Sequence, residues 1–388
     1  MKKEKLGNLI SLQRGYDLPA SKMRRGPYPV AGSNGIIGSH NIAKAQAPCI
    51  TIGRSGSVGK VHFYNRPIWP HNTSLYVTDF KGNNPRYIYY LLSLIDFTSV
   101  CGNSVVPSLN RNFVYPIEVP FFEDRKKQNR IDNVLTLLDK KIIFKRLENN
   151  LLENMAKQMY DYWFVQFDFP DANGNPYKSS GGKMVWNEKL KCEIPEGWEV
   201  KSIGSLFDVK LGGTPSTEIK EYWENGNIHW LNSGEVNNFP VCETEKMITE
   251  KAVKESSTVF LPKRSVLLSI TRHLRVTILN IDACVNQSVV GIEETKEIRY
   301  PFIYFALCAE IPRLMTLRTG AQQPHINKDI VESTEIIVPS KKSLNDFLMM
   351  VIPIFEKILL IGEEITELTN LRDFLLPLLM NGQVSIKE

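Results

Sequence analysis

The chain has 388 residues and a net charge of +5, and its 43% hydrophobic and 23% charged composition is typical of a folded protein with two or three cores. Its six Cys residues are widely spaced without a Cys-x-x-Cys pair, which argues against a disulfide framework or a thiolate zinc site and favours a reducing compartment. No apolar run approaches the roughly 18 residues that span a bilayer, and no apolar signal core opens the chain, so we expect a cytoplasmic protein without membrane contact.

Residues 1–122 are predicted to form a first mixed α/β domain, because short apolar runs alternate with Gly, Pro, Asn and Ser. Its first 66 residues are strongly basic, with 11 Lys or Arg against two Asp or Glu. Such a surface suits the phosphates of nucleic acid, although a basic surface without any ligand is about as compatible with charge alone.

The sharpest local motif is the Gly-rich stretch 52–60, Ile-Gly-Arg-Ser-Gly-Ser-Val-Gly-Lys. It resembles a nucleotide-binding phosphate loop, but Arg54 replaces a required glycine and Val61 replaces the Mg²⁺-binding hydroxyl. We interpret it as a tight turn between strands that presents cations to guanine edges and phosphates. The candidate DNA-contacting residues of this domain are Arg14, Ser33, Asn34, Arg54, Ser55, Ser57, Lys60, His62, Asn103 and Ser104.

Residues 123–167 contain neither Gly nor Pro and are predicted to form a long helix with an apolar seam at heptad spacing. Polar Lys145 and Asn149 interrupt the seam, which costs stability and can fix the register of pairing. The seam residues of this helix are Ile131, Leu135, Leu138, Ile142, Leu152 and Met159. Residues 168–195 follow as a Gly-, Asn-, Ser- and Lys-rich linker.

Residues 196–340 repeat the pattern of the first domain, which predicts a second domain of the same fold. Leu6-Gly7-x-Leu9-x-x-Leu12-x-x-Gly15 returns as Ile203-Gly204-x-Leu206-x-x-Val209-x-x-Gly212. Later, Pro107-x-x-Asn110-x-x-Phe113-Val114 returns as Pro324-x-x-Asn327-x-x-Ile330-Val331.

The second domain is acidic except for a basic island over 256–281, where the stretch 268–275 is related to the Arg54 loop but lacks its glycines. Asn and Gln suit adenine edges, although each such residue taken singly is more typical of a turn or cap, and an ordinary exposed loop is the alternative for the island. The candidate DNA-contacting residues here are Thr214, Asn232, Ser233, Arg272, His273, Arg275, Gln322, Gln323 and His325.

Residues 341–388 are predicted to form a second long helix, with Arg372 in its seam and with a kink or a late start at Pro353. Its seam residues are Ile358, Ile361, Ile365, Leu368 and Leu375. We expect the two seams to pair as an antiparallel coiled coil that acts as a spacer. The alternative is that each helix packs only on its own domain.

Motifs for catalysis are missing from the sequence. We find no Asp/Asn-Pro-Pro-Tyr/Phe tetrapeptide, no Gly-x-Gly-x-x-Gly, no paired-His motif and no Gly-x-Ser-x-Gly, and the six His residues are scattered. We therefore expect no catalytic residue, no cofactor site and no metal site in this chain.

The ends of the two helices carry a family resemblance. The stretches Leu375–Val384 (LLPLLMNGQV) and Tyr160–Phe169 (YDYWFVQFDF), the Ile-Pro-Glu-Gly-Trp opening at 194–198, and Lys127-Gln128 before Ile131 resemble the specificity (S) subunit of type I restriction-modification systems. The resemblance covers essentially the whole chain.

The resemblance implies two target-recognition domains that read a split double-stranded DNA sequence, with the helices setting the unread spacer. It also implies two methyltransferase (M) subunits and restriction (R) subunits as partners, in which S-adenosylmethionine, ATP and Mg²⁺ would act. A coiled-coil protein adaptor without DNA specificity and a nucleotide-dependent enzyme based on the Gly53–Lys60 loop are the competing hypotheses. A related system with fused nuclease and methyltransferase is not separated from type I by the sequence.

Overall fold

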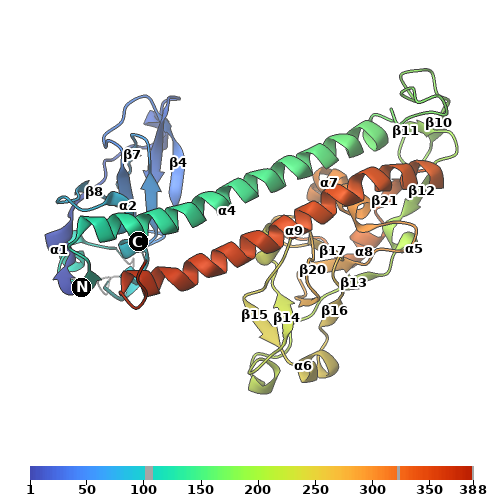
Figure 1. The fold of residues 1–388 in the computed structure, drawn as a ribbon. Helices are drawn as coiled ribbons and strands as arrows, with labels where there is room; N and C mark the ends of the chain where they lie inside the picture. Colours follow the sequence, from blue (N-terminus) through green and yellow to red (C-terminus); the bar gives the residue numbers. More distant parts are fainter. Residues whose placement is uncertain (101–107, 321–323, 387–388) are drawn as a thin grey trace. The chain divides into compact units, whose positions relative to one another are not determined.

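The structure is a computed structural model that describes residues 1–100, 108–320 and 324–386. The chain forms two compact units, Met1–Ile142 with Leu368–Glu388, and Ile143–Glu367. Each unit contains one mixed α/β domain and part of each of two long helices, α4 (Arg125–Tyr160) and α9 (Lys341–Met380) (Figure 1). The predicted fold class is confirmed.

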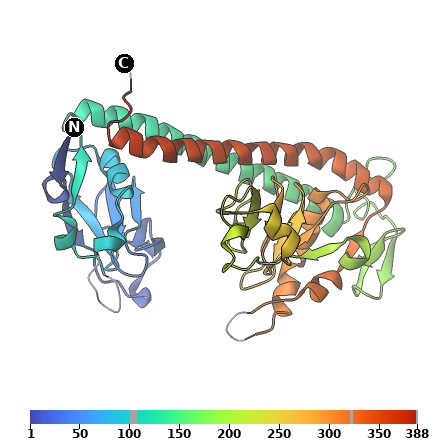
Figure 2. The same ribbon diagram turned by 90° about the horizontal axis from the view of Figure 1, so that it is seen from below.

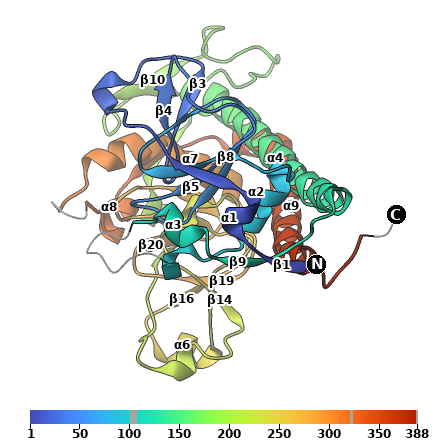
Figure 3. The same ribbon diagram turned by 90° about the vertical axis from the view of Figure 1, so that its left-hand side faces the viewer.

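The first domain is built on a four-stranded sheet of order β2-β8-β5-β6, a three-stranded sheet of order β4-β3-β7, and the pair β1-β9. Figure 3 faces this domain and shows α2 beside the larger sheet, where it packs against β5 and β6. The strands are β1 (Lys2–Lys5), β2 (Ser11–Arg14), β3 (Tyr28–Gly32), β4 (Gly35–His40), β5 (Cys49–Gly53), β6 (Val61–Tyr64), β7 (Trp69–Pro70), β8 (Ser74–Asp79) and β9 (Glu118–Phe121). The helices are α1 (Leu6–Leu9), η1 (Ala20–Lys22), α2 (Pro85–Ser93), η2 (Phe97–Val100) and α3 (Arg111–Val114).

The second domain repeats this plan with sheets of order β13-β20-β17-β18 and β15-β14-β19-β16, and the pair β12-β21. The strands are β12 (Glu199–Ser202), β13 (Val209–Leu211), β14 (Ile228–Leu231), β15 (Lys246–Ile248), β16 (Val259–Leu261), β17 (Val266–Ser269), β18 (Val276–Ile278), β19 (Ala283–Val285), β20 (Val289–Ile292) and β21 (Glu335–Val338). The helices are α5 (Ile203–Leu206), η4 (Lys220–Tyr222), η5 (Glu235–Asn237), α6 (Glu250–Glu255), α7 (Tyr300–Thr316) and α8 (Lys328–Glu332).

The repeated glycines of the sequence have a steric cause. A Cβ atom on Gly15 would lie 2.1 Å from the carbonyl oxygen of His71, and one on Gly212 would lie 2.3 Å from that of Asn286. Both contacts are with backbone, which cannot move aside as a flexible side chain can. The strand therefore approaches its neighbour equally closely in both domains, and only glycine fits there.

The repeated asparagines have a different cause, because each caps a short helix. The Asn110 side chain accepts a hydrogen bond from the N–H of Asn112 at the start of α3. The Asn327 side chain accepts one from the N–H of Ile330 at the start of α8. Helix starts of this kind favour asparagine, since its oxygen satisfies an amide that the helix leaves unpaired.

The long helices pair antiparallel in both units, and Figure 2 shows α9 running along α4. In the first unit, Leu379 packs in one core cluster with Ile131 and Leu135, and Arg372 forms an ion pair of 3.1 Å with Asp139. The predicted seam residues are all buried or half-buried in the two units, and polar Arg372 of the seam is satisfied by a charged partner.

In the second unit, the polar seam residue Lys145 forms an ion pair of 2.7 Å with Glu364. The start of α9 packs there in one core cluster with the end of α4 and the π-helical turn η3 (Asp161–Val165) that follows it. Since α9 begins at Lys341, the late start expected at Pro353 is wrong. The proline lies inside the helix on an exposed position.

The stretch between η3 and the second domain contains a hairpin of β10 (Met184–Asn187) and β11 (Cys192–Pro195). Trp198 then packs against the end of the first long helix, with its ring 4.8 Å from Phe169 in a stacked arrangement and 5.7 Å from Phe164. The aromatic residues that carry the family resemblance at this point are therefore core residues of the second unit.

Candidate nucleic-acid interface

The Gly-rich stretch of the first domain forms a tight turn between β5 and β6, as its pattern predicts. The N–H of Gly53 donates to the carbonyl oxygen of Lys60 at 2.8 Å, and the N–H of Gly59 donates to that of Gly53 at 2.9 Å. Gly56 adopts a positive φ of 81°. The turn leads directly into a strand, whereas a nucleotide-binding phosphate loop leads into a helix whose N-terminus binds the phosphate. This geometry disfavours the nucleotide-enzyme hypothesis.

Two further turns contact this one, and we call the three together the first turn cluster: residues 33–34, 54–60 and 71–73. Lys60 Nζ donates at 2.9 Å to the Oδ1 atom of Asn34, which lies in the turn between β3 and β4. The N–H of Arg54 donates at 2.8 Å to the carbonyl oxygen of Thr73, which lies in the turn between β7 and β8. The predicted residues brought together here are Ser33, Asn34, Arg54, Ser55, Ser57 and Lys60.

Of the other residues predicted in this domain, Arg14 is exposed at the end of β2, with its guanidinium 3.6 Å from the Asp17 carboxylate. His62 lies in β6, two residues after Lys60 of the cluster. Its Nε2 atom is buried and has no hydrogen-bond partner among the residues that the structure describes. Asn103 and Ser104 lie outside the described residues.

The stability of the first unit should fall as the pH falls through the titration of His62. Burial is the largest cause that lowers the pKa of His62 below its ordinary value of 6.5, and the charge of Lys60 lowers it further. Below pH 6.5 the unfolded chain therefore binds a proton that the folded chain binds less readily, so unfolding becomes more favourable. We expect His62→Gln to flatten the dependence of the melting temperature on pH between about pH 5.5 and 7.5. An unchanged slope in this variant would contradict the assignment.

The second turn cluster comprises residues 270–275, 286–288, 318–320 and 324–325. The N–H of Arg272 donates to the carbonyl oxygen of Pro324 at 2.8 Å, and Thr271 forms a β-bridge with His325. Arg318 Nη1 donates to the carbonyl oxygen of Arg272 at 2.6 Å. The predicted residues Arg272, His273, Arg275 and His325 thus come together, while Gln322 and Gln323 lie outside the described residues.

Equivalent backbone bonds correct the expected relation between the two loops. The carbonyl oxygen of Arg54 accepts from the N–H of Leu109 at 2.8 Å, and that of Ile270 accepts from the N–H of Ile326 at 3.0 Å. Arg54 therefore corresponds to Ile270, and Arg272 falls at the place of Gly56. Both residues at that place have a positive φ, 56° for Arg272 and 81° for Gly56. The second turn is one residue shorter, because the N–H of Ser269 donates to the carbonyl oxygen of Arg275 where that of Gly53 donates to Lys60, and the arginines occupy different places on the two turns.

Of the remaining predicted residues of the second domain, Thr214 and Asn232 are already hydrogen-bonded within the chain. Asn232 Oδ1 accepts from the N–H of Gly234 at 2.7 Å, and its Nδ2 donates to Glu235 at 2.7 Å, so the side chain holds a turn after β14. Ser233 lies within that turn. The Thr214 hydroxyl donates to Gln287 Oε1.

Sequence reasoning missed Asn72, Thr73, Gln287 and Arg318, which lie in the two clusters. A signal for the first three was present, because His71-Asn72-Thr73-Ser74 and Asn286-Gln287-Ser288-Val289 stand at corresponding places of the repeat with an amide side chain second in each. Arg318 follows α7, and a search for repeats in the sequence finds no counterpart of it in the first domain.

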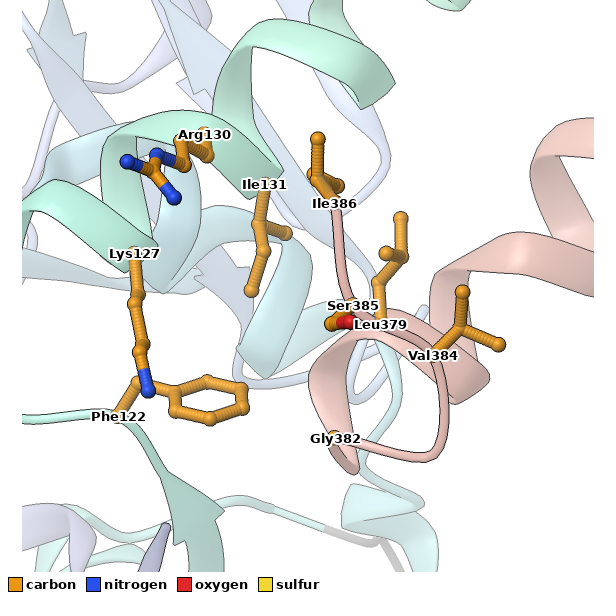
Figure 4. Close-up of a pocket in the computed structure, with 9 residues that line it drawn as sticks. All are labelled: Phe122, Lys127, Arg130, Ile131, Leu379, Gly382, Val384, Ser385 and Ile386. Atoms are coloured by element: carbon orange, nitrogen blue, oxygen red, sulfur yellow. The ribbon is translucent and has the colours of Figure 1, made fainter. Parts of the chain in front are cut away.

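A separate pocket of about 200 Å³ lies in the first unit where the end of α9 meets the start of α4 (Figure 4). It is lined by Phe122, Lys127, Arg130, Ile131, Leu379, Gly382, Val384, Ser385 and Ile386. Several of these belong to the stretches that carry the family resemblance, and the lining contains no predicted DNA-contacting residue.

Over 1–100, 108–320 and 324–386 there is no group of three or more His, Cys, Asp or Glu side chains that could hold a metal ion. Within the same ranges, each helix is too short or too polar to span a membrane.

The chain resembles known proteins along most of its length. The family model of the type I restriction modification DNA specificity domain matches residues 1–154 and 195–346. The type I restriction enzyme MjaIX specificity subunit of Methanocaldococcus jannaschii is 27% identical over 341 residues, which are 85% of this chain and 76% of that one. The HindI specificity subunit of Haemophilus influenzae is 25% identical over 312 residues, covering 67% of this chain and 68% of that one.

The fold is also known from a solved structure. The S subunit of a type I restriction-modification system from M. genitalium superimposes with a TM-score of 0.58 at 16% identity, covering 100% of this chain and 96% of that one. The two matched regions of the family model contain most of the two domains and of both turn clusters. This chain therefore belongs to the family of type I restriction-modification DNA specificity domains and carries that domain twice.

Proposed function

We propose that this chain is the specificity subunit of a type I restriction-modification complex and reads a split double-stranded DNA target, one part with each turn cluster. One observation carries the proposal: in both domains a hairpin turn contacts the turn before a neighbouring strand through the same backbone bond, Arg54 to Thr73 and Ile270 to Ser288, with different polar side chains in each copy. Two domains of the same fold that present different polar side chains are suited to bind two different half-sites.

The side chains in the clusters have the chemistry that base and phosphate contacts need. Arg54 and Arg272 offer bidentate donors that match the O6 and N7 acceptors of guanine, and Lys60 offers a point charge to phosphate. Because the basic residues gather in the first domain, we expect a steep fall of affinity with salt, by about 0.9 in log K per log salt for each phosphate contacted.

The test is methylation mapping by single-molecule sequencing in cells that express this chain with its methyltransferase, compared with cells that lack only this chain. A split methylated motif that requires the chain is the expected result. Arg272→Ala should then relax the base preference in one half of the motif and leave the other half unchanged. If no motif depends on the chain, the coiled-coil adaptor hypothesis is favoured instead.

We further propose that the chain is non-catalytic and acts with two M subunits and with R subunits, which would supply S-adenosylmethionine, ATP and Mg²⁺ chemistry in the cytoplasm. An exposed apolar stripe on α4 supports protein partners. Phe144 and Leu151 are 66% and 70% exposed, and Leu147 and Met155 lie on the same face of the helix. A stripe of large apolar side chains in water is typical of a surface that a partner covers.

Leu151→Asp is expected to weaken capture of the M subunit by at least about tenfold, because the carboxylate would be desolvated at the interface. The matched control is Asn150→Asp, which adds the same charge on another exposed face of the helix and should leave capture unchanged. Co-purification and sedimentation of the mixed subunits would measure the effect. Equal capture by both variants would place the M subunit elsewhere.

A further inference from the structure

Each turn cluster is joined by a hydrogen bond between two side chains, and the two pairs stand at corresponding places in the domains. In the first domain, Asn72 Nδ2 donates to Asp17 Oδ1. In the second, the Thr214 hydroxyl donates to Gln287 Oε1. The places correspond, because Asp17 and Thr214 each stand two residues after a glycine of the repeat.

Each pair lies against the Arg54 or Arg272 turn. The turn that carries Asn72 also carries Thr73, whose carbonyl oxygen accepts from the N–H of Arg54 at 2.8 Å. In the second domain, the carbonyl oxygen of Ser288 accepts from the N–H of Ile270 at 2.9 Å. Both amide side chains therefore stand beside the residues that we propose to contact DNA.

The pairs are not needed to hold the turns. The backbone closes the first turn through a bond of 2.9 Å from the N–H of Ser74 to the carbonyl oxygen of His71. The second is closed by the bond of 3.1 Å from Val289 to Asn286. The Asp17 side chain is 73% exposed, so its bond to Asn72 contributes little to stability. What the bond does control is the direction in which the amide faces.

An ionised carboxylate can only accept hydrogen bonds, so Asp17 requires the Nδ2 group of Asn72 to turn toward it. Asn72 then has its Oδ1 and its second amide proton left for a ligand, the pair that matches the N6–H donor and N7 acceptor of adenine. At Gln287 the partner is the hydroxyl of Thr214, which can donate or accept, and the amide oxygen keeps a second lone pair, so Gln287 is not restricted to one base edge. Arg14, 3.6 Å from Asp17, offsets the negative charge close to phosphates.

We propose that Asn72 and Gln287 are base-reading residues at equivalent places in the two domains, and that Asp17 is a positioning residue that sets Asn72 to read adenine. This inference rests on the proposed function of DNA reading. It adds two specificity-determining side chains and a base preference for one of them.

The experiment is methylation mapping of the full complex with Asn72→Ala, Gln287→Ala and Asp17→Asn. Asn72→Ala should lower the preference for one adenine·thymine pair in one half of the motif by roughly 5- to 150-fold, which corresponds to one bidentate contact. Gln287→Ala should act only on the other half. The matched control is Asn65→Ala, an exposed asparagine at the far end of β6, which should leave the motif unchanged.

Asp17→Asn separates positioning from structure. An amide at position 17 can donate or accept, so it no longer fixes Asn72, and the variant should lose base preference at the same pair as Asn72→Ala while keeping its melting temperature. A chain-dependent split motif that is identical in wild type and Asn72→Ala would overturn the inference and leave the proposed function intact. Uniform loss of methylation with unchanged base preference would overturn it as well. Absence of any chain-dependent motif in the wild type would instead be a failure of the proposed function.

Discussion

Phe347→Ala is expected to lower the free energy of unfolding of the second unit by about 3–5 kcal/mol, the range for truncation of a fully buried phenylalanine. Phe347 lies near the start of α9 with no exposed surface. Its ring centroid is 4.8 Å from that of Phe164 and 5.9 Å from that of Trp163. These contacts join the start of one long helix to the end of the other, so the cavity would open where the helices pair.

Denaturant unfolding followed by tryptophan fluorescence measures this loss, because Trp163 and Trp198 belong to the same core cluster. The matched control is Met349→Ala, on the same helix and in the same unit, since that side chain is 70% exposed and its removal should change the free energy by less than about 0.5 kcal/mol. Similar losses in the two variants would mean that the aromatic cluster does not stabilise the second unit.

The helices and the duplication could be predicted because their signals are local or periodic. A heptad pattern without Gly or Pro specifies a long helix whatever surrounds it, and the repeated glycines record two equally close strand contacts. Pro353 misled the prediction of a helix start. A helix of 40 residues packed along one side tolerates the loss of one backbone bond at an exposed position.

The clusters themselves could be predicted only in part, because they depend on contacts between turns far apart in sequence. Nothing local to Asn34 indicates that Lys60 will reach it. Arg54 and Arg272 are not counterparts, because the equivalent backbone hydrogen bonds pair Arg54 with Ile270. Sequence similarity alone does not show this. His62 illustrates the same limit, since a histidine in a basic loop suggested surface contact, whereas its Nε2 atom is buried.

The two domains share a fold and equivalent backbone bonds between their turns and differ in the side chains of those turns, which suits the reading of two different half-sites. Gly56 in the first domain and Arg272 in the second stand at the same place of the turn, and both have a positive φ. In the second domain, Arg318 donates to the carbonyl oxygen of Arg272, and this bond helps to hold a conformation that is unfavourable for arginine. A charged side chain can thereby occupy the tip of a turn whose shape would otherwise favour glycine.

Gly53→Ala is expected to abolish reading of the first half-site, with a loss of at least about tenfold in affinity for a DNA probe that carries that half. A Cβ atom on Gly53 would lie 2.0 Å from the carbonyl oxygen of Ser57 and 2.8 Å from that of Ser33. Both are backbone atoms of turns in the first cluster. The methyl group would therefore force two of its three turns apart, and such overpacking typically costs about 1–3 kcal/mol of stability.

Competition binding with probes mutated in one half at a time would measure this effect, using the motif obtained from methylation mapping. Gly38→Ala is the matched control in the same domain, because its Cβ would meet chiefly the Met23 Sδ atom, at 2.7 Å, on a flexible side chain that can move away. Gly212→Ala should produce the converse loss, since its Cβ would lie 2.3 Å from the carbonyl oxygen of Asn286 in the second cluster. If Gly53→Ala and Gly212→Ala both weakened the same half, the two clusters would not be independent readers; opposite losses would show that each domain reads its own half through the geometry of its turns.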